Sequence, residues 1–222
     1  ADIGIVGENV IYEKSKKAQI TEKLGFGKCR LCVAVGSNQQ YEGADFLSNK
    51  KIATTYPVLV TDFLKKKNIS AEIHEISGSV EIAPGIGLAD AIVDLVSSGS
   101  TLFMNGLKEA ETILQSEAVL IRHPDLDAGK EEILGKLLFR IRSVRKARHT
   151  KYILLNAPNA KLGEIISLLP GMKSPTVLPL AEAGWSSVHS VLNENEFWDI
   201  IEKLKAAGAQ GILVVPIEKM IL

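Results

Sequence analysis

The last third of the chain carries an order of strands and helices that few folds satisfy. Strand patterns occur at 150–155, 176–180, 185–192 and 210–215, and helical patterns at 160–169 and after Asn193. Asn193 and Glu196 have the spacing of a capping box at the start of the second helix, and Gly208 has the position of a glycine C-cap at its end. The order βαββαβ predicts a ferredoxin-like domain over residues 149–222.

Residues 1–148 alternate between strand and helix patterns. Strand patterns lie at 3–6, 29–35, 51–53, 71–76, 89–96 and 117–122. Helical periodicity is clear at 57–67 and 131–147, and the second segment has one apolar stripe: Ile133, Leu134, Leu137, Leu138, Ile141 and Val144. This alternation predicts an α/β architecture with a largely parallel sheet. Residues 2–7 read as a buried strand from the middle of a fold, so we expect further residues before Ala1.

The composition argues against nucleic-acid and membrane partners. The 26 basic and 26 acidic residues balance, so no net field attracts a polyanion or a lipid surface. The apolar runs are short and interrupted by charge, and residues 1–10 lack the features of a signal peptide. We therefore expect a cytoplasmic protein.

Cys29 and Cys32 form a C-x-x-C motif within an apolar, β-branched run. A redox pair usually opens a helix, where the helix dipole lowers the thiol pKa, and a zinc site needs a second pair of ligands. The four histidines also lack the spacing of metal ligands. The sequence therefore favours ordinary strand cysteines in a reducing compartment.

The stretch from Ser77 to Gly106 carries the strongest functional signal. Asp90 and Asp94 lie on a predicted strand at an even spacing, which puts both carboxylates on one face. The strand leads into small and hydroxyl residues whose backbone N–H groups can converge on a phosphate: Ser97, Ser98, Gly99, Ser100 and Thr101. Carboxylates beside such a loop suit sugar hydroxyls or a magnesium ion. A plain hairpin turn is the alternative interpretation.

Two neighbouring segments extend this hypothesis. The turn at 84–87 would let Glu81 approach the same pocket as Asp90. Residues 51–57 end a strand at Thr54 and Thr55 just before a helix that begins at Pro57. The N-terminus of that helix is either capped by a threonine or free to bind a second anion. No nucleophile motif such as G-x-S-x-G occurs, which favours catalysis by positioning and charge stabilisation.

These segments resemble one enzyme family. Residues 2–7 (DIGIVG), 52–57 (IATTYP) and 77–102 are similar to ATP phosphoribosyltransferases, which carry out the first step of histidine biosynthesis. The run 155–222, with SPTVLPL at 174–180 and PIEKM at 216–220, resembles the regulatory domain of the family's long form. The chain departs from the family in two ways: the family's first strand and helix are not present before Ala1, and Lys51 stands where arginine is usual.

The resemblance implies a two-lobed catalytic part, built like a type II periplasmic binding protein, over residues 1–148. One lobe would contain 1–27 and 103–148 and the other 28–102, with the regulatory domain at 149–222. The enzyme would join adenine N1 of ATP to phosphoribosyl pyrophosphate, with magnesium on the pyrophosphate, and histidine would inhibit it. The family suggests homo-dimers and hexamers. A non-catalytic solute-binding or amino-acid-sensing protein is the alternative.

The resemblance also implies a role for each candidate residue. The loop Ser97–Thr101 would bind the 5-phosphate of phosphoribosyl pyrophosphate. The residues that face the ribose and stabilise its developing positive charge would be Asp90, Asp94 and Glu81. The residues on the ATP side would be Lys51, Thr54 and Tyr56. The residues that contact the inhibitor histidine between subunits would be Asn156, Thr176 and Gly211. The protein alone would provide no complete metal site.

Overall fold

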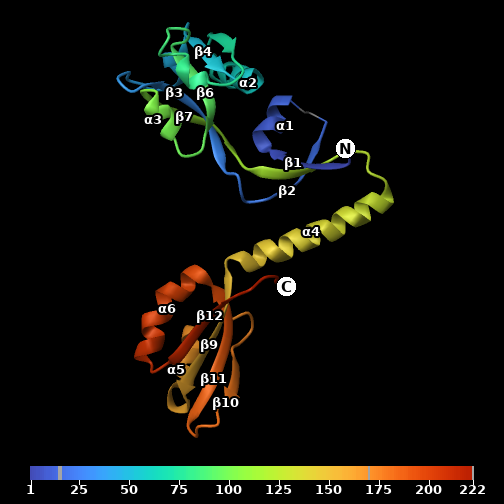
Figure 1. Cartoon of the computed structure of the whole chain (residues 1–222), viewed down its shortest axis with the longest axis vertical. Coiled ribbons are helices and arrows are strands. Elements are labelled where there is room, and N and C mark those ends of the chain that lie inside the picture. Colours follow the sequence, from blue (N-terminus) through green and yellow to red (C-terminus); the bar gives the residue numbers. More distant parts are fainter. Residues whose placement is uncertain (15–16, 170, 222) are drawn as a thin grey trace. The chain divides into compact units, whose positions relative to one another are not determined.

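The computed structural model describes residues 1–14, 17–169 and 171–221. They divide into two units, residues 1–127 and residues 128–222 (Figure 1). The first unit contains two sheets and the second contains one. Helices accompany all three sheets, so the predicted α/β class is confirmed.

The first lobe is a three-stranded antiparallel sheet in the order β1-β8-β2. Its strands are β1 (Ile3–Gly7), β2 (Gln19–Lys23) and β8 (Ala118–Arg122), and α1 (Glu8–Lys14) follows β1 directly. The strand predicted at 3–6 is therefore confirmed, but the prediction that it is buried is wrong. Ile3 and Ile5 are 40% and 58% exposed, because the described residues leave that face of the strand largely uncovered.

The second lobe is a five-stranded sheet in the order β5-β4-β6-β3-β7. Its strands are β3 (Cys29–Gly36), β4 (Lys51–Thr54), β5 (Glu72–Glu75), β6 (Ala91–Val96) and β7 (Leu107–Ser116). Only the pairs β4–β5 and β4–β6 are parallel, whereas β3 is antiparallel to β6 and β7. The prediction of a largely parallel sheet is wrong, because the strands on which the chain enters and leaves this lobe pair antiparallel.

Strand β7 also changes the predicted lobe boundary. It pairs with β3 from Leu107 to Ser116, so residues 103–116 belong to the second lobe and not to the first. The chain returns to the first lobe between Ser116 and Ala118, where β8 begins. The sequence did not reveal β7 because Lys108, Glu109 and Glu111 interrupt the alternation expected of a half-buried strand.

Apolar side chains pack on both faces of the second-lobe sheet. Helix α2 (Pro57–Lys67) covers one face through Val60, Phe63 and Leu64. The short helices η1 (Ala44–Leu47), η2 (Val80–Ile82) and α3 (Ser100–Met104) complete the lobe. Cys29 and Cys32 lie on β3 as free thiols, which confirms the prediction of ordinary strand cysteines.

Helix α4 (Ala128–Arg148) groups with the second unit, whereas the sequence predicts that the catalytic part extends to residue 148. Its predicted apolar stripe is only partly buried. Leu134 is buried, whereas Ile133 and Val144 are exposed to 66% and 50%. None of the helices in the described ranges is both long and apolar enough to cross a membrane.

The rest of the second unit confirms the βαββαβ prediction. A four-stranded antiparallel sheet has the order β10-β11-β9-β12. Its strands are β9 (Thr150–Pro158), β10 (Thr176–Pro179), β11 (Trp185–Asn193) and β12 (Gln210–Pro216). The helical elements are η3 (Asn159–Lys161), α5 (Leu162–Leu168) and α6 (Glu194–Ala206). Side chains of α5 and α6 pack on one face of the sheet around Ile153, Leu155 and Val188.

The predicted capping box is present at the start of α6. Asn193 Oδ1 accepts a hydrogen bond from the backbone of Asn195 at 3.0 Å, and Glu196 accepts one from the backbone of Asn193 at 3.2 Å. At the other end, Gly208 follows the C-cap with φ 93°, a conformation that favours glycine.

Replacing Asn193 by alanine should lower the free energy of unfolding of the second unit by about 1 kcal/mol, the usual value of an N-cap. Trp185 and Trp198, the protein's two tryptophans, both lie in this unit, so their fluorescence during urea unfolding reports on it. Asn195→Ala, at an exposed position in the same turn, is the control and should change that free energy by less than about 0.5 kcal/mol. Equal effects of the two substitutions would contradict the capping role.

Candidate active site

Asp94 is the centre of the candidate site. It lies on β6, its Oδ1 accepts hydrogen bonds from the backbone N–H of Leu95 at 2.8 Å and from Thr55 Oγ1 at 3.4 Å, and it is partly buried. Burial raises the pKa of the Asp94 carboxyl, and the nearby carboxylate of Glu81 raises it further, against the lowering effect of these hydrogen bonds. A carboxyl held in this way is typical of a functional site.

Tyr56 belongs to the same cluster. Burial raises the pKa of its phenol, and the charge of Asp94 adds to that rise, so the two side chains are near each other. Strands β4 and β6 are parallel, and Thr55–Tyr56 and Asp94 lie at or near their carboxyl ends. Ligands of α/β folds bind at such edges. Asp94, Glu81 and Tyr56 therefore lie close enough for their charges to interact.

The hydroxyl loop follows β6 immediately. Ser97, Ser98, Ser100 and Thr101 are exposed, and Gly99 precedes α3 with φ 81°. Ser98 and Ser100 share a hydrogen bond between their hydroxyls at 3.0 Å. The loop therefore presents hydroxyls and backbone N–H groups to solvent beyond the edge that carries Asp94, which is an arrangement suited to an anion.

An ion pair that the sequence did not predict supports this loop. Arg30, on β3, donates from Nη1 to the carbonyl of Ser97 at 3.0 Å and from Nε to Glu109 on β7 at 2.7 Å. The guanidinium holds the pKa of Glu109 below its usual range. Glu109 Oε1 lies 2.9 Å from the position that a Cβ would take at Gly99. Arg30 therefore both contacts the loop and neutralises the carboxylate beside it.

Asp90 and Lys51 do not join this cluster. Asp90 precedes β6, and its Oδ2 accepts a hydrogen bond from the backbone N–H of Lys51 at 2.9 Å. Both residues line a separate polar cavity of about 530 Å³ with Asn38, Gln39 and Asn105. Four residues of strand, about 13 Å, separate Asp90 from Asp94. The prediction that the two carboxylates share one strand face is wrong, because the strand begins after Asp90.

Thr54 does not have the position expected of a residue on the ATP side. Its side chain is fully buried, and Oγ1 accepts a hydrogen bond from the backbone N–H of Tyr56 at 2.9 Å. Thr54 therefore stabilises the turn before α2 instead of facing a ligand. The neighbouring Thr55 provides the hydroxyl that donates to Asp94.

Known proteins match this chain along most of its length. The sequence profile of the family described as ATP phosphoribosyltransferase matches residues 1–143, and that of "HisG, C-terminal domain" matches residues 147–219. The chain is 58% identical over 222 residues to the ATP phosphoribosyltransferase of Bacteroides thetaiotaomicron, covering 100% of this chain and 78% of that protein. It is also 58% identical over 221 residues to that of Cytophaga hutchinsonii, covering 100% and 77%.

The chain belongs to the ATP phosphoribosyltransferase family. It is thus a transferase of the first step of histidine biosynthesis. A solved structure, the ATP phosphoribosyl transferase (HisG:HisZ) complex from Thermotoga maritima, has 27% sequence identity and a TM-score of 0.56, and covers 62% of this chain and 67% of that chain. The two-lobed fold expected of a transferase of this family is confirmed, with a ferredoxin-like domain following it.

The structure brings together two of the three residues expected to contact histidine in this transferase. Asn156 on β9 lies beside Gly211 on β12: its Nδ2 is 3.3 Å from the position that a Cβ would take at Gly211, whose φ is 56°. Thr176 lies on β10, and β11 separates that strand from β9. Within one chain, Thr176 therefore does not adjoin the other two.

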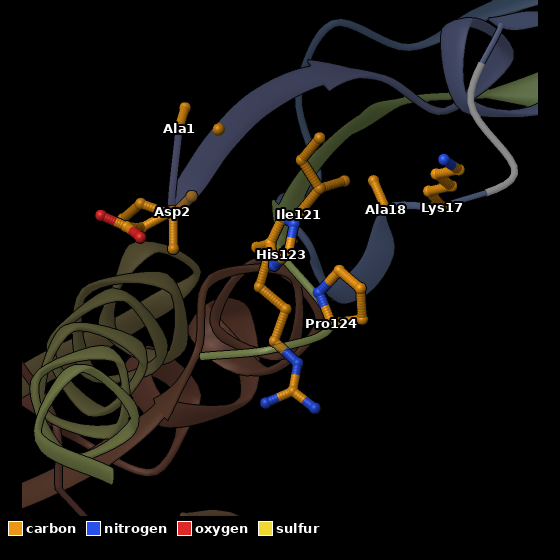
Figure 2. Close-up of a pocket in the computed structure, with 10 residues that line it drawn as sticks. Ala1, Asp2, Lys17, Ala18, Ile121, His123 and Pro124 are labelled. Atoms are coloured by element: carbon orange, nitrogen blue, oxygen red, sulfur yellow. The ribbon is translucent and has the colours of Figure 1, made fainter. Parts of the chain in front are cut away.

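A further cavity, of about 300 Å³, lies at one end of the first-lobe sheet. Figure 2 shows Ile121, on β8, and His123, which follows that strand, between Ala1–Asp2 and Ala18. This cavity has neither the hydroxyl loop nor the Asp94 cluster, so it is not part of the transferase site.

Proposed function

We propose that this protein joins ATP, through N1 of its adenine, to phosphoribosyl pyrophosphate, and that histidine inhibits it. The observation that carries the reaction is that Asp94 lies on the strand that leads into the exposed loop Ser97–Thr101, within range of the charges of Glu81 and Tyr56. A sugar phosphate bound by the loop would place its ribose next to these carboxylates.

In this proposal the loop Ser97–Thr101 binds the 5-phosphate. Its backbone N–H groups and hydroxyls are free of bulky side chains, and Gly99 lets the backbone approach the anion. Arg30 supports the loop from beneath and cancels the repulsion that Glu109 would otherwise exert on a phosphate.

The carboxylates lie where the anomeric carbon of the ribose would react. The lone pair of adenine N1 forms the new bond to the anomeric carbon of the ribose. The bond between that carbon and pyrophosphate breaks at the same time, and the electrons of the broken bond leave with pyrophosphate. The sugar gains positive charge during this exchange, and Asp94 with Glu81 would stabilise that charge. Because N1 carries no proton, the site needs no general base, and it acts by aligning the two substrates and stabilising the developing charge.

A magnesium ion fits this site only together with substrate. No group of three His, Cys, Asp or Glu residues in the described ranges could hold a metal ion. Magnesium usually binds one or two carboxylates together with phosphate oxygens and water. We therefore assign most of its ligands to the pyrophosphate, with Asp94 and Glu81 as the nearby protein carboxylates; when bound, it would neutralise the leaving group.

The nucleotide side of the proposed site is Tyr56 with Thr55. Both lie between β4 and α2, and Thr55 contacts Asp94 directly. Lys51 and Thr54 are left out, because Lys51 lies at the other end of β4 and Thr54 is buried.

Removing Arg30 should weaken the sugar-phosphate half of the site selectively. We expect Arg30→Ala to raise KM for phosphoribosyl pyrophosphate about fivefold to tenfold, the equivalent of one hydrogen bond, and to leave KM for ATP unchanged. Arg30→Lys keeps the charge without the bidentate geometry and should be intermediate. Steady-state rates of phosphoribosyl-ATP formation measure both constants. Equal changes in the two constants would contradict the supporting role of Arg30 in the loop.

The regulatory proposal places histidine at the C-terminal sheet, between copies of the chain. One face of this sheet carries exposed Tyr152, Leu178 and Leu213, which supports contact with a second copy. Asn156 offers an amide to the amino acid, and the positive φ of Gly211 turns the backbone beside it.

Calorimetric titration with histidine tests the site. We expect binding that Thr176→Val weakens about fivefold to tenfold, because valine has the shape of threonine without its hydroxyl. The same titration with alanine as ligand is the control for non-specific heat. An unchanged histidine affinity in Thr176→Val would remove this residue from the site.

A further inference from the structure

Helix α2 starts next to the proposed nucleotide site without a cap of its own. Tyr56 is its N-cap residue, and its side chain makes no capping hydrogen bond. Pro57 has no N–H group, and the N–H of Val60 already bonds to the carbonyl of Tyr56 at 3.0 Å. The first turn therefore has two N–H groups that need a partner, those of Val58 and Leu59.

Glu13, in the first lobe, accepts hydrogen bonds from both of these N–H groups. Its Oε1 accepts from Val58 N at 3.0 Å and its Oε2 from Leu59 N at 3.0 Å. Glu13 lies on α1, which directly follows strand β1 of the first-lobe sheet. A carboxylate in this place also interacts favourably with the helix dipole. A second-lobe helix is thus capped by a first-lobe side chain.

Asn9 makes a second contact across the lobes from the same helix. Four residues before Glu13, it lies on the same side of α1 and donates from Nδ2 to the hydroxyl of Tyr56 at 3.3 Å. Asn9 is only 3% exposed, and its backbone N–H donates to Ser116 Oγ at 3.1 Å. Ser116 Oγ in turn donates to Asn9 Oδ1 at 2.9 Å. This links Tyr56 to the point where the chain crosses between lobes.

We infer that Glu13 is a positioning residue for the nucleotide half of the site. By capping α2 across the lobes it holds Thr55 and Tyr56 against Asp94, and Asn9 acts with it. The inference rests on the proposed function, because it assigns Thr55 and Tyr56 to the ATP side. It adds that the geometry of this side depends on a carboxylate that does not touch substrate.

Two variants of Glu13 and one control test it by calorimetry with ATP and, separately, with phosphoribosyl pyrophosphate. Glu13→Ala removes both hydrogen bonds to the first turn of α2 and should weaken ATP binding about fivefold to thirtyfold, the loss expected for a typical to a strong N-cap. Glu13→Gln keeps one acceptor oxygen and should be intermediate. Affinity for phosphoribosyl pyrophosphate should stay within about twofold in both.

The control is Asn68→Ala at the opposite end of α2. Asn68 has φ 57°, so alanine there also destabilises the helix, but without touching the first lobe. Scanning calorimetry should show a loss of thermal stability in Asn68→Ala as in Glu13→Ala, whereas ATP affinity should fall only in the Glu13 variants. Unchanged ATP affinity in Glu13→Ala, or an equal loss in Asn68→Ala, would overturn the inference. Failure of the unmodified protein to make phosphoribosyl-ATP would instead overturn the proposed function.

Discussion

Replacing Asp94 by asparagine is expected to lower kcat about a hundredfold to a thousandfold, the usual loss when one preorganised electrostatic contact to a transition state is removed. Asparagine keeps the size and the hydrogen-bonding oxygen of Asp94 but not the negative charge that would stabilise the sugar. Asp62→Asn is the matched control, because Asp62 is an exposed carboxylate of α2 in the same lobe and should leave kcat unchanged. A wild-type rate in Asp94→Asn would remove this residue from the mechanism.

The raised pKa of Asp94 also predicts how the activity of the unmodified protein depends on pH, with Asp94→Asn as the comparison. The active form requires the carboxylate, so activity should fall on acidification at a pH above the ordinary range of an aspartate, and the residual activity of Asp94→Asn should lack this decline. The free energy of unfolding changes with pH in the opposite direction to the activity. Between the ordinary and the raised pKa the unfolded chain loses the proton first, so the free energy of unfolding falls as pH rises through that window. At neutral pH, urea unfolding should therefore find Asp94→Asn at least as stable as the unmodified protein.

Replacing Gly99 by valine is expected to lower kcat/KM for phosphoribosyl pyrophosphate more than about a hundredfold. A β-branched residue at φ 81° is strained by roughly 1–3 kcal/mol, and its Cβ would lie 2.9 Å from Glu109 Oε1. Glu109 has little freedom to move away, because Arg30 binds it. The loop would then turn its N–H groups away from the phosphate, and those contacts would be lost as well.

The control for Gly99→Val is Gly184→Val in the second unit. Gly184 has a similar φ of 85°, and a Cβ there would meet nothing within 4 Å. It separates the general effect of a strained valine from the effect on the loop. Steady-state kinetics should show the loss only in Gly99→Val. Similar kinetics for the two variants would mean that the loop does not bind the sugar phosphate.

The elements that could be predicted from sequence are those with local signals. The C-terminal domain was recognisable because Asn193, Glu196 and Gly208 mark the two ends of α6 within the sequence itself. Helix α2 was recognisable from Pro57 and the spacing of Phe63 and Leu64. The loop Ser97–Thr101 was recognisable because its composition alone suits an anion.

The elements that could not be predicted depend on contacts between distant residues. Arg30 and Glu109 are 79 positions apart, and their pairing becomes visible only when β7 is placed beside β3. Glu13 caps α2 from 45 positions away. Asp90 was misplaced for the same reason: spacing alone does not show that its carboxylate bonds to the backbone of Lys51 and that the strand begins after it.

The most direct test of this account is the product mixture formed from ATP and phosphoribosyl pyrophosphate with magnesium. Anion-exchange chromatography of the quenched reaction should show phosphoribosyl-ATP and pyrophosphate in equal amounts, only when both substrates are present, and almost none of either with Asp94→Asn. Hydrolysis of either substrate alone, or equal product yields from the unmodified protein and Asp94→Asn, would contradict the account.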